Sequence, residues 1–531
     1  MPPRKKKPEQ PQTMRELHDI LWKSADKLRG SMDAAQYKDF VLGLVFLKYV
    51  SDAFTERREQ IRAELVEQGI PESRVDGFLG DQDEYTGHGV FWVPESARWD
   101  NLVRDVGDNP GEKIDDAMDE IMKSNEPLTG VLPKIFNRDN VDQIRLGELL
   151  ALISDARFTG HGDRPARDVL GEVYEYFLEK FARAEGKRGG EFYTPSSVVR
   201  LLVEVLEPYS GRVYDPCCGS GGMFVQAEKF VVAHRGRRED LSVYGQEANE
   251  RTWRLAKMNL AIHGIGGNLG PRWADTFRED KHPDIKADFI LANPPFNMSD
   301  WARRTDDARW RYGVPPAGNA NFAWLQHIVS KLRETGNGGV VLANGSMSSQ
   351  QSGEGEIRAA MVEADLVSCL IALPPQLFRT TQIPACLWFF SANKGPQGAK
   401  RLVERRGETL FINARDMGVL VNRTEREFTA EELAKIAGTY HAWRGTKSAR
   451  AAGLKYEDIP GFCHSATIEE IRTHNHVLSP GRYVGVAEID NSGAEPTVAK
   501  IERLTKELYA NFDEAARLDA VVREQLERIN G

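Results

Sequence analysis

The distribution of apolar and polar positions divides the chain into three parts. From Thr13 to about Phe54, apolar residues recur three and four positions apart, as in a helix with one buried face. Further amphipathic stretches continue to about Phe158, which predicts a mainly helical first part. From Pro496 onward the pattern is that of one long charged helix.

Between the two helical parts, short apolar runs alternate with segments long enough for helical crossovers. The runs are GRVYDP, LSVYGQE, ADFILAN, GGVVLANG and DLVSCLIALP. This alternation predicts an α/β fold, in which a doubly wound, mainly parallel sheet carries helices on both faces. A later run, LWFFSANK, predicts a further strand that closes the sheet.

These patterns give four segments along the chain. We expect a disordered basic arm over residues 1–12, a helical N-terminal domain over 13–160, the α/β domain over 161–485 and a C-terminal helical tail over 486–531. The basic start lacks the apolar stretch of a secretory signal, so the cytoplasm is the expected location.

Composition excludes several classes of protein. Hydrophobic residues make up 41% of the chain, and we find no apolar run near the roughly 20 residues that span a bilayer. The five cysteines form no CxxC pair, so they predict neither a disulfide scaffold nor a zinc site. The net charge of −9 is unlike that of a protein whose whole surface binds phosphates, so DNA binding would need a local patch or a basic partner.

A glycine turn follows the first predicted strand of the α/β part. Asp215 ends this strand, and Gly219, Ser220, Gly221 and Gly222 lead into an apolar helix. A strand, a glycine turn and a helix N-terminus let the backbone approach a nucleotide-like cofactor. The alternative is a tight turn without a ligand. The GxGxxG pattern is not met and no GxxxxGK occurs, which disfavours NAD and ATP.

Two acidic residues follow later strands. Glu247 ends the second predicted strand, where a carboxylate is placed to accept two hydrogen bonds from a ribose diol. Asp275 follows a predicted third strand and is suited to accept from an adenine amino group. For either residue, a solvated acid at a strand end is the alternative.

The segment Asn293-Pro294-Pro295-Phe296 ends the strand Ala287–Ala292 and carries the strongest chemical signal. The prolines fix the backbone, so the Asn293 Oδ1 atom and the Pro294 carbonyl can accept both hydrogens of one amino group. Phe296 then offers a face on which an extruded base can stack. A proline turn without chemistry is the alternative.

DPCCGSGG followed by NPPF resembles the amino-methyltransferases of DNA, whose adenine-specific branch typically has Asn at the first position of the second motif. The upstream GEFYTPS resembles the segment that closes over the methionine part of the cofactor, which matches the gamma order of motifs. Four further segments, LHDILWKSADKLRGSMDAAQYKDFVLGLVFLKYVSDAF, GNANFAWLQHI, ALPPQLFRTTQIPACLWFF and VLSPGRYV, are similar to the modification subunit of type I restriction-modification systems.

This resemblance implies an S-adenosyl-L-methionine-dependent DNA adenine-N6 methyltransferase that acts on double-stranded DNA. It also implies a separate specificity subunit, a second modification subunit and a restriction/translocase subunit as partners, with no metal. The implied catalytic residues are Asn293, Pro294, Pro295 and Phe296. The implied cofactor site comprises Glu191, Phe192, Tyr193, Thr194, Pro195, Ser196, Asp215, Gly219, Ser220, Gly221, Gly222, Glu247 and Asp275.

Two other segments suggest contacts with partners. WARRTDDARWRYGVPP interleaves Trp301, Trp310 and several arginines, as expected for a loop that meets the DNA backbone, although a charged surface loop has the same composition. In the tail, Ile501, Leu508, Ala515, Val522 and Ile529 recur every seven residues, with Leu504 and Leu518 between them. This spacing predicts a coiled-coil seam, and a helix folded back on its own domain is the alternative.

Two further classes of function remain open from sequence. An NPP turn can activate any planar amino group, so cytosine N4, a protein glutamine or an RNA amine is an alternative target. A non-catalytic interaction subunit is the other alternative.

Overall fold

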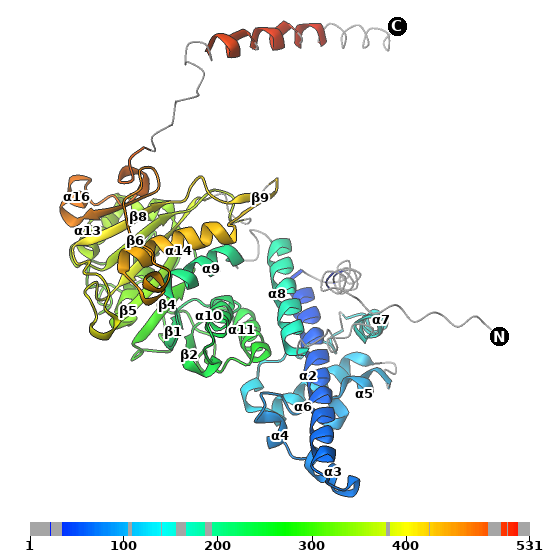
Figure 1. The fold of residues 1–531 in the computed structure, drawn as a ribbon. Coiled ribbons are helices and arrows are strands. Elements are labelled where there is room, and N and C mark those ends of the chain that lie inside the picture. Colours follow the sequence, from blue (N-terminus) through cyan, green and yellow to red (C-terminus); the bar gives the residue numbers. More distant parts are fainter. Residues whose placement is uncertain are drawn as a thin grey trace, which may run out of the picture. The chain divides into compact units, whose positions relative to one another are not determined.

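The computed structural model divides the chain into two units, residues 1–484 and residues 485–531 (Figure 1). The structure describes residues 18, 22, 34–104, 109–139, 141–154, 166–185, 194–378, 383–423, 425–486, 501–506, 508–513 and 515–518. Among the described residues, no helix is both long enough and apolar enough to cross a membrane.

The helical part of the first unit is built around α2, which continues past Phe54 to Glu67. Apolar residues of α2, including Leu47 and Phe54, share one buried cluster with Val173 and Phe177 of α8. A helix that buries much of its surface in this way is stabilised mainly by packing. The helices of this part are α2 (Ala34–Glu67), α3 (Glu72–Leu79), α4 (Asp83–Thr86), α5 (Trp99–Arg104), α6 (Pro110–Ser124), α7 (Gln143–Ser154) and α8 (Ala166–Glu185).

Over the described residues, the α/β part contains a nine-stranded sheet in the order β11-β8-β6-β7-β5-β4-β1-β2-β3. Strands β7 and β11 run antiparallel to their neighbours, and the other pairs are parallel. The strands are β1 (Gly211–Asp215), β2 (Leu241–Gly245), β3 (Gly267–Asn268), β4 (Ala287–Ala292), β5 (Leu332–Ala343), β6 (Val367–Ala372), β7 (Ala385–Ser391), β8 (Glu408–Asn413) and β11 (Cys463–Thr467).

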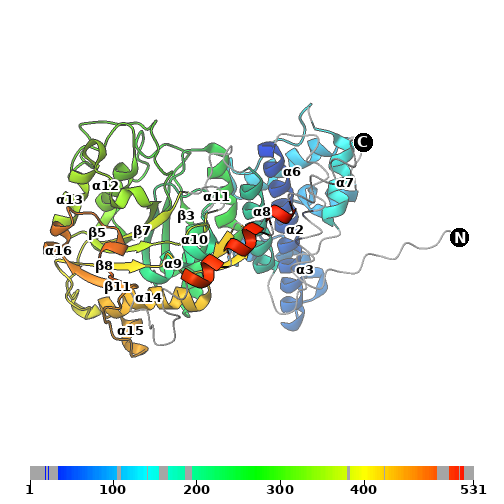
Figure 2. The same cartoon turned by 90° about the horizontal axis from the view of Figure 1, so that it is seen from above.

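Helices cover both faces of this sheet, as Figure 2 shows. One face packs against α9 (Ser196–Leu206), α10 (Gly222–Ala233), α11 (Glu250–His263) and α14 (Ala430–Arg444). The other packs against α12 (Asn321–Lys331), α13 (Glu354–Glu363) and α16 (Ile468–Thr473), and the short α15 (Lys447–Ala451) follows α14. The predicted doubly wound, mainly parallel sheet with a helical N-terminal part is therefore confirmed.

One expectation about an individual strand was wrong. The LWFFSANK run forms β7, which lies between β5 and β6 instead of closing the sheet. Every residue of β7 is buried because it has neighbours on both sides, and the sheet continues beyond β6 to β8 and β11. The predicted third strand before Asp275 is present as β3, a short strand over Gly267–Asn268, and a longer irregular segment follows it.

The parallel strands β2, β1 and β4 are adjacent, so they end at one edge of the sheet. Asp215 at the end of β1 pairs with Gly245 at the end of β2, and Asn293 directly follows β4. Ligands of open α/β sheets bind outside the carboxyl ends of such strands. In the second unit, the described residues 501–506, 508–513 and 515–518 are helical.

Candidate active site

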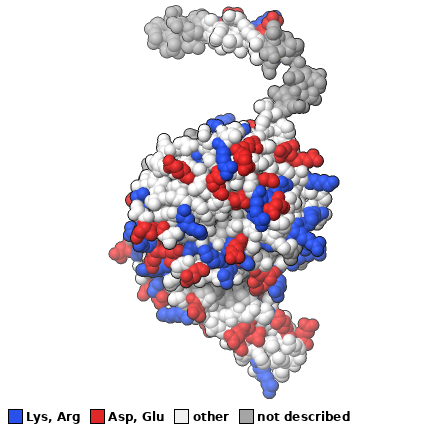
Figure 3. Space-filling view, turned by 90° about the vertical axis from the view of Figure 1, so that its left-hand side faces the viewer, with Lys and Arg blue, Asp and Glu red and all other residues white. Residues whose placement is uncertain are grey.

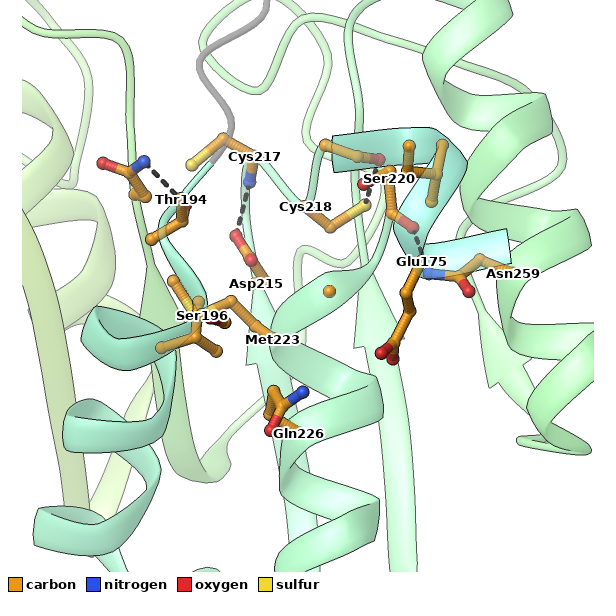
Figure 4. A pocket seen from close by; sticks show the side chains of 15 residues that line it. Glu175, Thr194, Ser196, Asp215, Cys217, Cys218, Ser220, Met223, Gln226 and Asn259 are labelled. Atoms are coloured by element: carbon orange, nitrogen blue, oxygen red, sulfur yellow. Dashed lines mark hydrogen bonds between the residues drawn. The ribbon is translucent and has the colours of Figure 1, made fainter. Parts of the chain in front are cut away.

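A cavity of about 110 Å³ opens at the carboxyl ends of β1 and β4 (Figure 4). It brings together residues of the glycine turn, the segment before α9 and the Asn293 turn, with two side chains of α8 at its wall. The cavity is lined by Glu175, Leu178, Thr194, Ser196, Val199, Asp215, Cys217, Cys218, Gly219, Ser220, Gly222, Met223, Gln226, Asn259 and Asn293.

The glycine turn combines left-handed backbone with open space. Gly219 and Gly221 have φ values of +55° and +82°, which residues with a side chain rarely adopt. A Cβ atom added at Gly219 or Gly222 would meet no atom within 4 Å, so the backbone is accessible at both positions. At Gly221 an added Cβ would meet Ala256 at 3.7 Å, an ordinary contact, so the backbone conformation is what requires glycine there.

Two carboxylates hold this turn. Asp215 is buried, and its Oδ1 accepts a hydrogen bond from the Cys217 backbone N–H at 3.0 Å. Burial raises the pKa of Asp215 to about 7, and the nearby charge of Glu247 acts in the same direction. Glu247 accepts from the Gly219 N–H at 3.0 Å through Oε2 and from the Asn249 N–H at 2.8 Å through Oε1.

Asp275 lies beside Glu247 but, like it, outside the lining of the cavity. The Ala274 N–H donates to the Glu247 carbonyl at 2.8 Å, which joins the two segments. The Oδ1 atom of Asp275 accepts from the backbone N–H groups of Phe277 at 2.7 Å and Arg278 at 3.0 Å. These bonds fix the orientation of the Asp275 carboxylate at this edge.

The Asn293 side chain is held by the segment that precedes α9. Its Nδ2 donates to the Thr194 Oγ1 atom at 2.7 Å. Its Oδ1 is buried and accepts from no group among the described residues. An unpaired buried acceptor is costly unless a ligand or a water molecule satisfies it, and Asn293 is among the residues that line the candidate cavity. Pro294 is buried and Pro295 half-buried, and the half-buried Phe296 packs edge-to-face against Phe378 with ring centroids 6.0 Å apart.

The structure therefore places the predicted residues of three motifs around one edge of the sheet. Thr194 and Ser196 line the cavity, and Pro195 is the N-cap of α9. Glu191, Phe192 and Tyr193 lie outside the described residues.

Sequence motifs did not indicate the contributions of α8 and α11 to this cavity. Glu175 of α8 pairs with Lys229 of α10 at 2.8 Å and lies 3.6 Å from the His263 ring. Asn259 of α11 donates to the Ser220 carbonyl at 2.9 Å, which supports the glycine turn from below. These are single polar residues within helical patterns, and only the packing of α8 against α11 brings them to the site.

The loop that follows the Asn293 turn buries side chains that its composition had suggested would be exposed. Trp301 and Trp310 are both buried, in one aromatic cluster with Phe277. Arg309 forms an ion pair with Asp307 at 2.5 Å and donates to the Thr276 carbonyl at 3.0 Å. The expectation that these tryptophans and Arg309 meet DNA was therefore wrong, although Arg303, Arg304 and Arg311 of the same loop are exposed.

The fold and the site together define a methyltransferase of the amino-group type. A family model described as N-6 DNA Methylase matches residues 165–492, and a second, described as HsdM N-terminal domain, matches residues 17–153. The chain therefore belongs to the N-6 DNA methylase family, as its sequence motifs predicted.

Relatives of known name are similar to this chain over most of their length. The chain is 48% identical over 455 residues to the type I restriction enzyme HindI methylase subunit of Haemophilus influenzae, covering 82% of this chain and 99% of that protein. It is 39% identical to the MjaIX methylase subunit of Methanocaldococcus jannaschii, covering 97% and 91%. A methyltransferase subunit of a type I restriction-modification system from Streptococcus thermophilus has a similar structure, with a TM-score of 0.71 and 26% identity over 89% of this chain and 100% of that chain.

Proposed function

We propose that this protein transfers a methyl group from S-adenosylmethionine to the N6 atom of an adenine extruded from double-stranded DNA. The observation that carries the proposal is the orientation of Asn293, whose Nδ2 is engaged by Thr194 while its buried Oδ1 accepts from no described group. An amino group is a donor that can satisfy such an acceptor. Asn293 directly follows β4, and β4 is the parallel neighbour of β1, which leads into the glycine turn. An adenine amine bound by Asn293 would therefore lie close to a cofactor bound at the glycine turn.

The residues of the edge fit S-adenosylmethionine by their chemistry. The accessible backbone at Gly219 and Gly222 suits close approach of the amino acid part, with Thr194, Ser196 and Ser220 in the lining of the cavity. Pro195, the N-cap of α9, joins two of these lining residues and is assigned to the same part of the site. Glu247 is assigned to the ribose diol, Asp275 to the adenine amine of the cofactor and Asp215 to the wall between them. Glu191, Phe192 and Tyr193 are assigned to the cover of this site by sequence alone.

The reaction needs positioning more than acid–base chemistry. When bound, the cofactor supplies a methyl group already activated by a sulfonium. Asn293 Oδ1 and the Pro294 carbonyl accept the two hydrogens of the target amine, which directs the nitrogen lone pair toward that methyl group. With the cofactor bound, its methyl group would pass from the sulfonium sulfur, which would leave as a thioether, to the amine that Asn293 and Pro294 hold, and the methylated amine would then lose a proton to solvent. Phe296 stacks on the extruded base.

Sequence specificity is assigned to a separate subunit, and cleavage to a further one. Lys and Arg side chains are interspersed with Asp and Glu on the face that Figure 3 shows, and the chain has a net charge of −9. A mixed surface of this kind attracts DNA weakly, so neighbouring subunits must supply much of the attraction. The names of the relatives, methylase subunits of type I restriction enzymes, support assembly with other subunits in general. We assign a specificity subunit, a second methylase subunit and a restriction subunit as these partners from the sequence resemblance.

The test uses Asn293→Ala in the full chain, assembled with its specificity subunit. We expect methyl transfer to fall below about a tenth of wild type, a barrier increase above roughly 1.4 kcal/mol, with cofactor affinity within a few fold. Asn101→Ala, in helix α5 of the helical part, serves as the matched control.

Mass analysis of nucleosides from the methylated DNA identifies the target atom. N6-methyladenine supports the proposal, and N4-methylcytosine or unmodified DNA refutes it. Turnover of Asn293→Ala above a tenth of wild type refutes the role of the side chain. Failure of the wild-type chain to bind S-adenosylmethionine in calorimetry would favour a non-catalytic interaction subunit.

A further inference from the structure

A small two-stranded ribbon lies outside the main sheet and has no core of its own. It consists of β9 (Val419–Asn422) and β10 (Glu425–Glu427), which pair antiparallel. All four residues of β9 are exposed, and the side chains of Val419, Leu420 and Val421 are 50%, 57% and 49% exposed. Alternate residues of a strand point to opposite faces, so apolar groups are presented to solvent on both faces of β9. Contiguous exposed apolar residues of this kind mark an interaction surface.

The ribbon stands at the same edge of the sheet as the candidate active site. It follows β8, which runs parallel to β6. Both β6 and β5 are antiparallel to β7, and β5 is parallel to β4, so β8 ends at the edge where Asn293 follows β4. Figure 1 shows β9 projecting from the body of the α/β part.

Hydrogen bonds fix the base of the ribbon to the segment that contacts Phe296. The Arg426 N–H donates to the Gln376 carbonyl at 2.9 Å, and the Arg426 guanidinium donates to the Gly418 carbonyl at 2.6 Å. Two residues after Gln376, Phe378 packs against Phe296. The position of the ribbon is thereby set by the same segment that supports the residue assigned to the target base.

The end of the ribbon carries a positive charge. Arg423 directly follows β9, is exposed, and forms no ion pair or hydrogen bond with another described residue. A two-stranded ribbon is narrow enough to enter a groove of B-DNA, and apolar side chains inserted from a groove can hold a base step unstacked. Exposed arginine then contributes a phosphate contact. The combination of location, apolar faces and a cationic end favours DNA over a protein partner.

We propose that the β9–β10 ribbon enters the DNA groove beside the extruded adenine, where Val419, Leu420 and Val421 contact the neighbouring bases and Arg423 contacts a phosphate. The inference rests on the proposed function, because it requires an adenine extruded toward Asn293. The ribbon would thereby make a second contact with the DNA. This contact is with the duplex around the extruded adenine, whereas Asn293 binds the adenine itself.

The experiment compares the full chain with a variant carrying Val419→Thr, Leu420→Thr and Val421→Thr, each assembled with the specificity subunit. Threonine keeps the β-branched shape that favours a strand and removes apolar surface. Val232→Thr is the matched control, because Val232 is 45% exposed near the end of α10, which begins at the active-site edge and runs away from it. The DNA is a duplex of the site that the wild-type complex methylates, with 2-aminopurine at the target adenine.

We expect the triple variant to lose most of the 2-aminopurine fluorescence rise, and its KM for unmodified DNA to increase roughly tenfold. Its affinity for S-adenosylmethionine stays within about twofold of wild type, because the ribbon does not line the cofactor cavity. Val232→Thr behaves as wild type. In a separate variant, Arg423→Gln, the slope of log affinity against log salt decreases by about one, the value for one phosphate contact.

Each contrary result is distinct. Unchanged fluorescence and KM in the triple variant overturn the proposal, and so does loss of co-elution with the specificity subunit, which would make the ribbon a protein-docking surface. An unchanged salt slope in Arg423→Gln overturns the phosphate contact. If the wild-type complex itself forms no N6-methyladenine, the proposed function fails. If wild type methylates adenine and the triple variant equals it, only the ribbon inference fails.

Discussion

The amide of Asn293 is oriented by Thr194, whose Oγ1 accepts a hydrogen bond from Asn293 Nδ2 at 2.7 Å. In this orientation Oδ1 is left to accept from the target amine, whereas reversal of the amide would place two donors where that amine must donate. Thr194 is separated from Asn293 by 99 positions in sequence, and only the fold brings them together.

Thr194→Val should therefore impair turnover through Asn293. Valine has nearly the same shape as threonine and cannot accept the hydrogen bond. We expect kcat to fall several-fold, corresponding to about 1 kcal/mol for one hydrogen bond, while the KM for S-adenosylmethionine changes little. Thr194→Ser keeps the hydroxyl and should restore most of kcat in a tritium-transfer assay. Equal losses in the Val and Ser variants would show that Thr194 contributes packing and not orientation.

Gly222→Val should block the cofactor site sterically. Gly222 begins α10 without a positive φ, and an added Cβ meets no atom within 4 Å, so a larger side chain enters the open space without backbone strain. We expect S-adenosylmethionine affinity in calorimetry to fall by more than tenfold, whereas the thermal unfolding midpoint changes little. Gly221→Val also reduces binding, but through its φ of +82°, so it lowers the midpoint as well.

The matched control for Gly222→Val is Gly266→Val, since Gly266 also has open space around its Cα and lies away from the cavity lining. Normal cofactor binding by Gly222→Val would remove the glycine turn from the proposed site.

The sequence motifs indicated the part of the candidate site whose residues combine a chemical role with a position at a strand end. Asp215, the glycines and Asn293 each end a strand or follow one, and parallel strands of one sheet bring their ends to one edge. The position of β7 within the strand order was not predictable in the same way. A continuous apolar run indicates that a strand is buried, but it does not indicate which strands pair with it. Trp301 and Trp310 were misassigned because an aromatic residue in a polar loop can either bury itself against a distant partner such as Phe277 or face solvent.

The buried Asp215 should make stability depend on pH. Burial raises its pKa to about 7 in the folded protein, against roughly 3.9 in an unfolded chain. The folded state then binds more protons than the unfolded state between these values, so the contribution of Asp215 to the free energy of unfolding decreases as pH rises through this window.

Asp215→Asn removes this titration. We expect the free energy of unfolding of wild type, relative to that of Asp215→Asn, to decrease by roughly 3 kcal/mol between about pH 5 and about pH 8 in urea titrations. Above the folded pKa the difference should become constant. A difference that stays level, or that increases with pH, would mean that Asp215 is ionised throughout in the folded protein.

The C-terminal helix carries an apolar stripe that the other described residues of the second unit do not cover. Ile501, Leu504, Leu508 and Leu518 are 58%, 47%, 51% and 50% exposed. Their spacing, with the exposed Ala515, is that of a coiled-coil seam, and the remaining predicted seam positions, Val522 and Ile529, lie outside the described residues. A seam of this spacing suits a partner helix, and we assign it to helices of the specificity subunit, with a helix folded back on its own domain as the alternative.

Truncation after Gly493 tests this assignment. The first unit ends at Val484, so we expect the truncated chain to remain folded and to bind S-adenosylmethionine as the full chain does. Because the seam is removed, the truncated chain should no longer co-elute with the specificity subunit in size-exclusion chromatography, and its site-specific methylation should be lost. Leu504→Asp with Leu508→Asp in the full chain should have the same effect, since two charges in the seam oppose burial. Co-elution at the full mass of the complex together with normal methylation would show that assembly uses another surface.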